Sequence, residues 1–134
     1  MSDLAYALVQ VGHNLGAAGV VAPPAAALWW AREAAPRRRL AWLSLAVWSL
    51  QALTGAGFAA VSWTTKGALP EVESIALAAL ATKLLCTVVG IAVGLLLVRA
   101  RAGASLIVPS RLWSTSLAAG VVALVGAAFL RWYL

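Results

Sequence analysis

The segment Leu77–Val98, LAALATKLLCTVVGIAVGLLLV, decides the fold class of this chain. It is almost entirely apolar, and no proline interrupts it. About 20 apolar residues in a helix are enough to cross the ~30 Å hydrocarbon core of a lipid bilayer. The segment therefore predicts a transmembrane helix. One lysine, Lys83, lies within it, so the question is what this side chain faces.

The composition of the whole chain agrees with a membrane protein. Of its 134 residues, 63% are hydrophobic and only 10% are charged, whereas soluble domains carry about 25% charged residues. The net charge of +6 comes from clustered arginines, which in a membrane chain mark cytoplasmic loops. We therefore expect the lipid bilayer as a partner and no nucleic acid.

Three further apolar stretches are long enough to span the membrane. We predict an all-α integral membrane protein in which residues 1–134 form a single domain, a bundle of four transmembrane helices. Pro23 and Pro24 interrupt the first span, and a proline inside a helix removes a hydrogen bond and clashes with the preceding turn. We expect a kink or a separate short turn near Val21. The predicted spans are residues 4–31, 40–64, 72–98 and 112–134.

Local signals indicate where two of these helices begin. Pro70 fits a first helical turn, and Glu71 and Glu73 complement the positive end of the helix dipole, so the third helix should start there. Ser110 is the expected N-cap of the fourth helix, because its hydroxyl can accept a hydrogen bond from a free backbone amide.

The basic residues predict the orientation. Seven arginines fall in two connections, the basic loop 32–39 and the segment 99–111, whereas Lys66 and Arg131 lie on the opposite side. Because positively charged connections stay in the cytoplasm, both termini should lie outside, an N-out/C-out topology. We expect a multi-pass protein of a bacterial cytoplasmic (inner) membrane.

Aromatic and basic residues near the span ends are candidates for contact with lipid headgroups. Tryptophan is enriched at the membrane interface, and neighbouring arginines attract anionic lipids, although topology alone also explains them. Tyr6, Trp63, Trp132 and Tyr133 mark the outer interface. The candidate residues at the inner interface are Trp29, Trp30, Trp42, Trp113, Arg37, Arg38 and Arg39.

Polar residues of three spans fall at one depth. With a rise of about 1.5 Å per residue, His13, Gln51 and Lys83 all lie near the middle of their spans. The fourth span has no polar residue at this depth. The candidate ligand-binding residues of this polar layer are His13, Asn14, Gln51, Thr54, Lys83 and Thr87.

The polar layer lies on faces rich in small residues. Lys83, Thr87, Gly90 and Gly94 share one face of the third helix, and small residues four apart let helices approach closely. We expect this face to pack within the chain; association of two copies through the glycines is the alternative.

No Asp or Glu lies within any span. Lys83 therefore either is neutral, or contacts backbone carbonyls and Gln51, or faces an anion supplied by a solute, a cofactor or a partner subunit. The purely structural alternative is that His13 and Gln51 link helices and that Lys83 bends toward water.

Catalytic motifs are absent from the sequence, which has no P-loop, no G-x-S-x-G and no HExxH. We expect no enzymatic activity from this chain alone. His13 is a candidate axial ligand of haem b, with the second ligand from a symmetric dimer or another subunit. It is also a candidate metal ligand, with Cys86 and Met1 as the other soft donors for copper.

Three segments resemble copper-resistance membrane proteins of the CopD type: GHNLGAAGVV (12–21), LTGAGFA (53–59) and the third span with its terminal arginines. The resemblance implies a half-size member that pairs with itself, with candidate positions at His13, Lys83 and a Gly55/Gly57 turn. It favours a protein that binds or passes a small solute or ion. The alternatives are a non-catalytic membrane subunit of a redox complex that binds haem or quinone, and a structural partner in a larger membrane complex.

Overall fold

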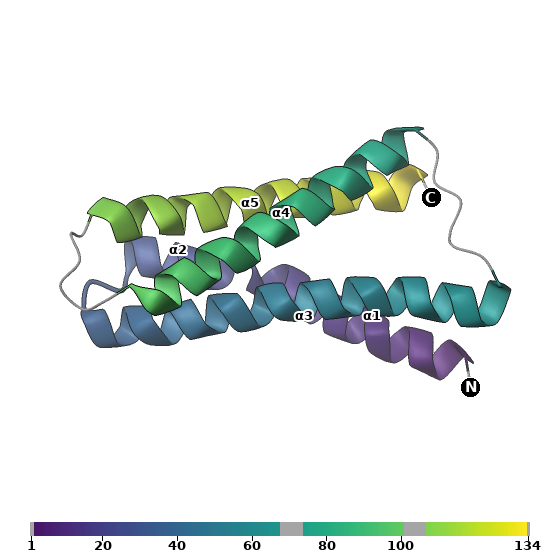
Figure 1. Ribbon diagram of the computed structural model, residues 1–134, viewed down its shortest axis with the longest axis horizontal. Helices are drawn as coiled ribbons and strands as arrows, with labels where there is room; N and C mark the ends of the chain where they lie inside the picture. The colour runs from purple at the N-terminus through teal and green to yellow at the C-terminus, as the bar shows by residue number, and fades with distance from the viewer. Residues whose placement is uncertain (1, 68–73, 101–106, 134) are drawn as a thin grey trace.

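The computed structural model describes residues 2–67, 74–100 and 107–133, and this part of the chain is helical apart from short connections (Figure 1). Four units are long and apolar enough to cross a membrane: Asp3–Trp29, Ala35–Thr65, Ser74–Arg99 and Ser110–Trp132. The predicted multi-pass four-helix bundle is therefore confirmed. The helices are α1 Ser2–Gly19, α2 Ala22–Trp29, α3 Ala34–Lys66, α4 Ser74–Arg99 and α5 Ile107–Tyr133.

The predicted break in the first span is also confirmed. Helix α1 ends at Gly19 and α2 begins at Ala22. Pro23 and Pro24 occupy the first turn of α2, where a helix can do without the amide hydrogens that proline lacks. Both prolines are buried, so the break lies inside the bundle.

The predicted basic loop 32–39 is wrong for most of its length. Helix α3 begins at Ala34, because Pro36 is compatible with a first helical turn. The Nε of Arg37 donates a hydrogen bond to the carbonyl of Ala31, at 2.7 Å. This bond ties the start of α3 to the connection, which shrinks to residues 30–33.

The predicted N-cap at Ser110 is wrong as well, since α5 already begins at Ile107. Pro109 then falls in the first turn, where proline is tolerated. The start predicted for the third helix at Pro70, Glu71 and Glu73 lies outside the described residues. Within them, α4 begins at Ser74.

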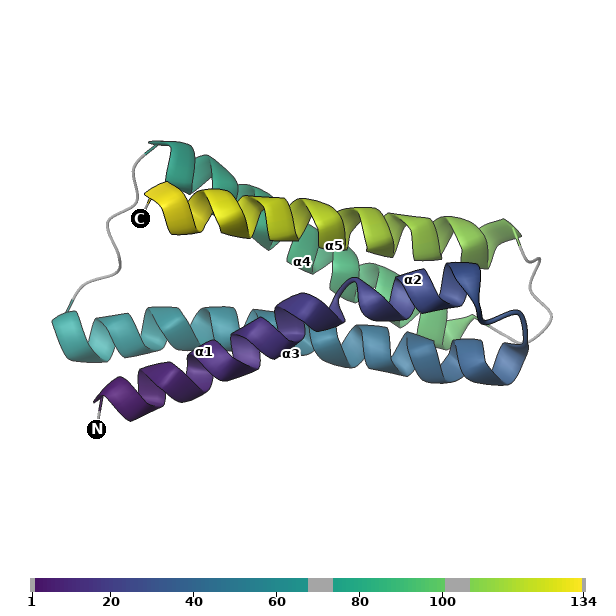
Figure 2. The same ribbon diagram turned by 180° about the vertical axis from the view of Figure 1, so that it is seen from behind.

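The helices form two pairs that meet at one end of the molecule (Figures 1 and 2). Helix α1 packs on α3, α4 packs on α5, and the short α2 fills the space between α3 and α5. We call the end with connection 30–33 the arginine end and the end with Gly67 and both chain termini the termini end. The two pairs lie together toward the arginine end and diverge toward the termini end.

The core joins the two pairs from mid-length to the arginine end. A Cβ at Gly90 would overlap the ring of Trp48, and one at Gly94 would lie 3.1 Å from the Cα of Leu45. The small-residue face of α4 therefore packs within the chain, as predicted. One buried cluster lies at mid-length, with Val20, Trp48, Cys86, Ala119 and Ala123, and the other toward the arginine end, with Ala27, Ala41, Val93, Leu97 and Trp113.

Candidate functional site

His13 of α1 lies between the two helix pairs and has a partner on each side. Its Nδ1 is 2.9 Å from the hydroxyl oxygen of Thr54 on α3. Its Nε2 is 2.8 Å from the Nζ of Lys83 on α4. The three side chains thus form a continuous polar link from α3 through α1 to α4.

The hydroxyl of Thr54 determines which nitrogen of His13 carries a proton. That hydroxyl donates its single proton to the carbonyl of Leu50 at 2.7 Å, so toward His13 its oxygen can only accept. Nδ1 is therefore the protonated nitrogen that donates to Thr54. Nε2 is left with its lone pair directed at Lys83, whose amine donates to it.

Lys83 connects two helices that otherwise make little contact. Helix α4 packs closely on α5 and, toward the arginine end, on α3. The long side chain of Lys83 reaches from α4 to the ring on α1. Among the described residues, His13 is the hydrogen-bond partner of the Lys83 amine, and residues 4–31, 40–64, 74–98 and 112–134 include no Asp or Glu that could neutralise it.

Gln51 lies beside this link with one of its polar atoms unsatisfied. Its Nε2 donates to the backbone carbonyl of His13 at 3.0 Å, and Gly16 of α1 leaves room for the amide group. Gln51 is only 7% exposed, and its Oε1 has no hydrogen-bond partner among the residues that the structure describes. A buried unpaired oxygen costs about 1–3 kcal/mol, which a water or a ligand carrying a donor would offset.

Asn14 and Thr87 do not join the link. Asn14 is exposed and accepts a hydrogen bond from Gln10 at 2.8 Å. Thr87 donates to the backbone carbonyl of Lys83 at 2.9 Å, so its hydroxyl is used within α4. Of the six predicted residues, the structure brings together His13, Gln51, Thr54 and Lys83. The predicted turn at Gly55 and Gly57 is wrong, because α3 continues through both residues.

An aromatic pair, which the sequence did not assign to the site, adjoins the histidine. Phe58 makes an edge contact with the His13 ring at 5.3 Å between centroids and another with Tyr6 at the same distance. Phe58 follows Thr54 by one helical turn and therefore lies on the same face of α3. This four-residue spacing could have assigned Phe58 to the site from the sequence. Phe58 therefore contacts the His13 ring directly, and Tyr6 contacts Phe58.

The site does not fit a metal or a haem iron. Both ring nitrogens of His13 are engaged. Nε2 faces the amine of Lys83, which has no lone pair for a metal when it is an ammonium group. In the described part of the chain, no group of three or more His, Cys, Asp or Glu residues could hold a metal ion. Cys86, the other candidate donor, packs in the mid-length cluster.

The predicted interface residues divide into exposed and buried ones. Trp29, Trp30 and Trp42 are exposed, as headgroup contact requires, whereas Trp113 is only 1% exposed. The interface prediction for Trp113 is wrong because this ring fills the space between α2, α3 and α4. Arg38 and Arg39 are exposed, whereas the half-buried Arg37 is bound to the carbonyl of Ala31.

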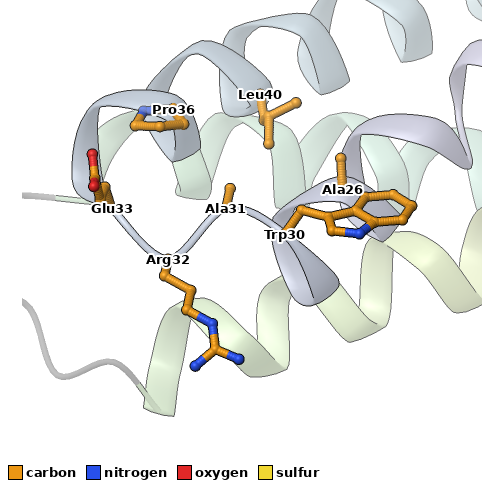
Figure 3. A pocket seen from close by; sticks show the side chains of 7 residues that line it. All are labelled: Ala26, Trp30, Ala31, Arg32, Glu33, Pro36 and Leu40. Atoms are coloured by element: carbon orange, nitrogen blue, oxygen red, sulfur yellow. The ribbon is translucent and has the colours of Figure 1, made fainter.

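A shallow depression of about 460 Å³ lies at the connection between α2 and α3 (Figure 3). Trp30 and Arg32 border it on one side, and the carboxylate of Glu33 points away from them. It lies at the arginine end, far from the His13–Lys83 contact. Its lining residues are Ala26, Trp30, Ala31, Arg32, Glu33, Pro36 and Leu40.

Comparison of the chain with family models, curated proteins and solved structures finds no match. The resemblance to CopD-type proteins therefore stays a prediction.

Proposed function

We propose that this protein binds a small solute or ion at the contact between His13 and Lys83 and passes it across a bacterial inner membrane, with both termini outside. The observation that carries the proposal is the 2.8 Å contact between Lys83 Nζ and His13 Nε2. It links two diverging helix pairs at mid-span, and no acidic side chain of the described residues pairs with Lys83. The chain has no catalytic role of its own in this proposal.

The cost of such a contact favours a functional role over a structural one. Insertion of a lysine at the centre of a membrane helix costs about 2.5–3.5 kcal/mol. An apolar pair could join the same helices at lower cost, because buried ion pairs can often be replaced by apolar residues without loss of stability. The unsatisfied Oε1 of Gln51 next to His13 is a second sign of a site that accepts a further polar group.

Two other roles explain part of this geometry. In a redox subunit, His13 would bind haem or quinone, but axial ligation of haem needs the nitrogen that faces Lys83. In a structural subunit, an acid on a second copy or on another chain would pair with Lys83. A Soret band in the purified protein would support the first role, and co-purification with a larger subunit the second.

The test compares ligand-induced stabilisation in wild type and two variants. A ligand that binds only the folded state raises the unfolding temperature, and the stabilisation grows with the logarithm of the ligand concentration above Kd. We expect at least one solute from a panel of small anions, cations and neutral molecules to stabilise wild type but not Lys83→Met. Thr82→Val is the matched control, since Thr82 is exposed and its hydroxyl donates to its own helix at 2.8 Å. If no solute distinguishes wild type from Lys83→Met, the proposal is wrong.

A further inference from the structure

The contact between His13 and Lys83 limits the charge that the site can hold. At 2.8 Å, one nitrogen must donate a proton and the other must offer a lone pair. Nδ1 of His13 is already protonated and faces Thr54. If Nε2 and Nζ both carried protons directed at each other, the contact would break. The intact pair therefore carries at most one positive charge.

No other charged group lies at this depth on the surrounding helices. Within residues 4–31, 40–64 and 75–98, the titratable side chains besides His13 and Lys83 are Tyr6 on α1 and Cys86 on α4. Tyr6 packs its ring on Phe58, and Cys86 is buried in the mid-length cluster. Helix α3 faces the pair with the neutral Thr54 and Gln51, and the sequence from Leu112 to Leu130 in α5 has no ionisable residue.

From this arrangement, and on the basis of the function proposed above, we infer that the ligand is a small monovalent anion that enters together with one proton. The anion takes the place of the direct contact and accepts one hydrogen bond from Nζ and one from Nε2. The added proton goes to the lone pair of Nε2. In the intact pair with a protonated Lys83 and a neutral His13, the charge is +1. With the ligand bound, His13 and Lys83 carry two positive charges and the anion carries one negative charge, so the total stays at +1.

This balance explains why the anion and the proton enter together. Charge interactions are strong in a medium of low dielectric constant, so a change in net charge is expensive there. A proton without the anion would break the contact and place two like charges side by side. A cation would meet the Lys83 amine directly. Only an anion turns both nitrogens into donors that point at one ligand.

The test uses the fact that His13 is the only histidine of the chain. With ¹⁵N-labelled histidine in lipid nanodiscs, every imidazole signal comes from this ring. We compare sodium formate, whose anion is small, with sodium gluconate, whose anion is large, at neutral pH and equal ionic strength. In gluconate we expect a proton on Nδ1 and none on Nε2.

In formate we expect the ratio of doubly to singly protonated His13 to rise about tenfold, a coupling of about 1.4 kcal/mol, within the usual range for linked sites. Thr82→Val should behave like wild type, and Lys83→Met should lose the response. Formate labelled with ¹³C shows separately whether the anion contacts the ring.

The outcomes separate this inference from the proposed function. If labelled formate contacts His13 and Nε2 stays unprotonated, the coupling to a proton is wrong, while binding at the site stands. In another outcome, a cation or a neutral solute from the panel stabilises wild type but not Lys83→Met, while formate does not contact the ring. In that case the inference of an anion is wrong and the proposed function stands. If formate causes no change and the panel also fails, both are wrong.

Discussion

The two ends of the molecule are built in different ways. From mid-length to the arginine end, glycines, serines and alanines let α2, α3, α4 and α5 approach closely around Trp48 and Trp113. Toward the termini end, Gly16 is the only buried residue described in α1, and none of residues 52–65 of α3 is buried. The two helix pairs diverge there (Figure 2).

This difference shows where the polar site lies in the bundle. Helix association in lipid depends on close packing and interhelical hydrogen bonds, since the lipid is as apolar as the helices. A well-packed interface leaves no space for a ligand. The contact between His13 and Lys83 lies at the transition, where packing between the pairs ends and a polar link takes over.

The largest expected effect comes from removing the central ring of the packed part. Trp48 is 1% exposed and its Nε1 donates to the Ser116 hydroxyl at 3.4 Å. Trp48→Ala should lower the free energy of unfolding by about 3–5 kcal/mol, measured by denaturation in detergent micelles. Trp63→Ala at the termini end removes the same side chain from a 60% exposed position and should change stability little. Equal losses would contradict the contrast between the two ends.

Two glycine substitutions, one in the packed part and one toward the termini end, should change stability in opposite directions and by less than Trp48→Ala does. A Cβ at Gly90 would overlap the Trp48 ring, whereas one at Gly55 would have no atom within 4 Å. Gly90→Ala should destabilise the protein by about 1–3 kcal/mol through overpacking. Gly55→Ala should stabilise it by about 0.5–1 kcal/mol, because alanine favours the helix. Thermal unfolding of both variants in the same detergent provides the measurement, and effects of the same sign would refute the prediction.

The smallest expected effect on stability concerns the polar link itself. Thr54→Val removes the acceptor of the His13 Nδ1 proton and should cost about 1 kcal/mol. It should also alter the protonation pattern of the ring, because the proton can then move to Nε2. The histidine ¹⁵N spectrum reports this change directly. Thr82→Val, which removes a hydroxyl bonded only within its own helix, should leave the spectrum unchanged.

Much of the fold could be predicted because its signals are local. The lengths of the apolar segments give the four spans, and the restricted backbone of Pro23 and Pro24 gives the break before α2. The polar layer could be predicted because residues at equal distances along neighbouring spans lie at similar depth. The same counting placed Asn14 and Thr87 in the layer, since it gives the depth of a residue and not the direction of its side chain.

The remaining features depend on packing between segments far apart in the sequence. A tryptophan near the end of a span is predicted to lie at the membrane interface. Trp113 is buried instead, because neighbouring helices pack around it, and the sequence near Trp113 does not indicate this. The contact of Trp48 with Gly90 requires the crossing of α3 and α4, which no local pattern specifies. The hydrogen bond from Arg37 to the carbonyl of Ala31 forms only because the chain turns back after α2. The local sequence does not show this turn, and the start of α3 was therefore predicted too late in the chain.

The joint at Val20 and Val21 has a mechanical consequence for the site. Helix α2 is fixed by α3 and α5, and Gly120 of α5 lies against the Val20 carbonyl, whereas α1 rests mainly on α3. His13 is seven residues from this pivot, a lever arm of about 10 Å. Because of this lever arm, a rotation of α1 by about 10° at the break would displace the imidazole by about 2 Å, enough to lengthen a hydrogen bond to Lys83 beyond its usual range.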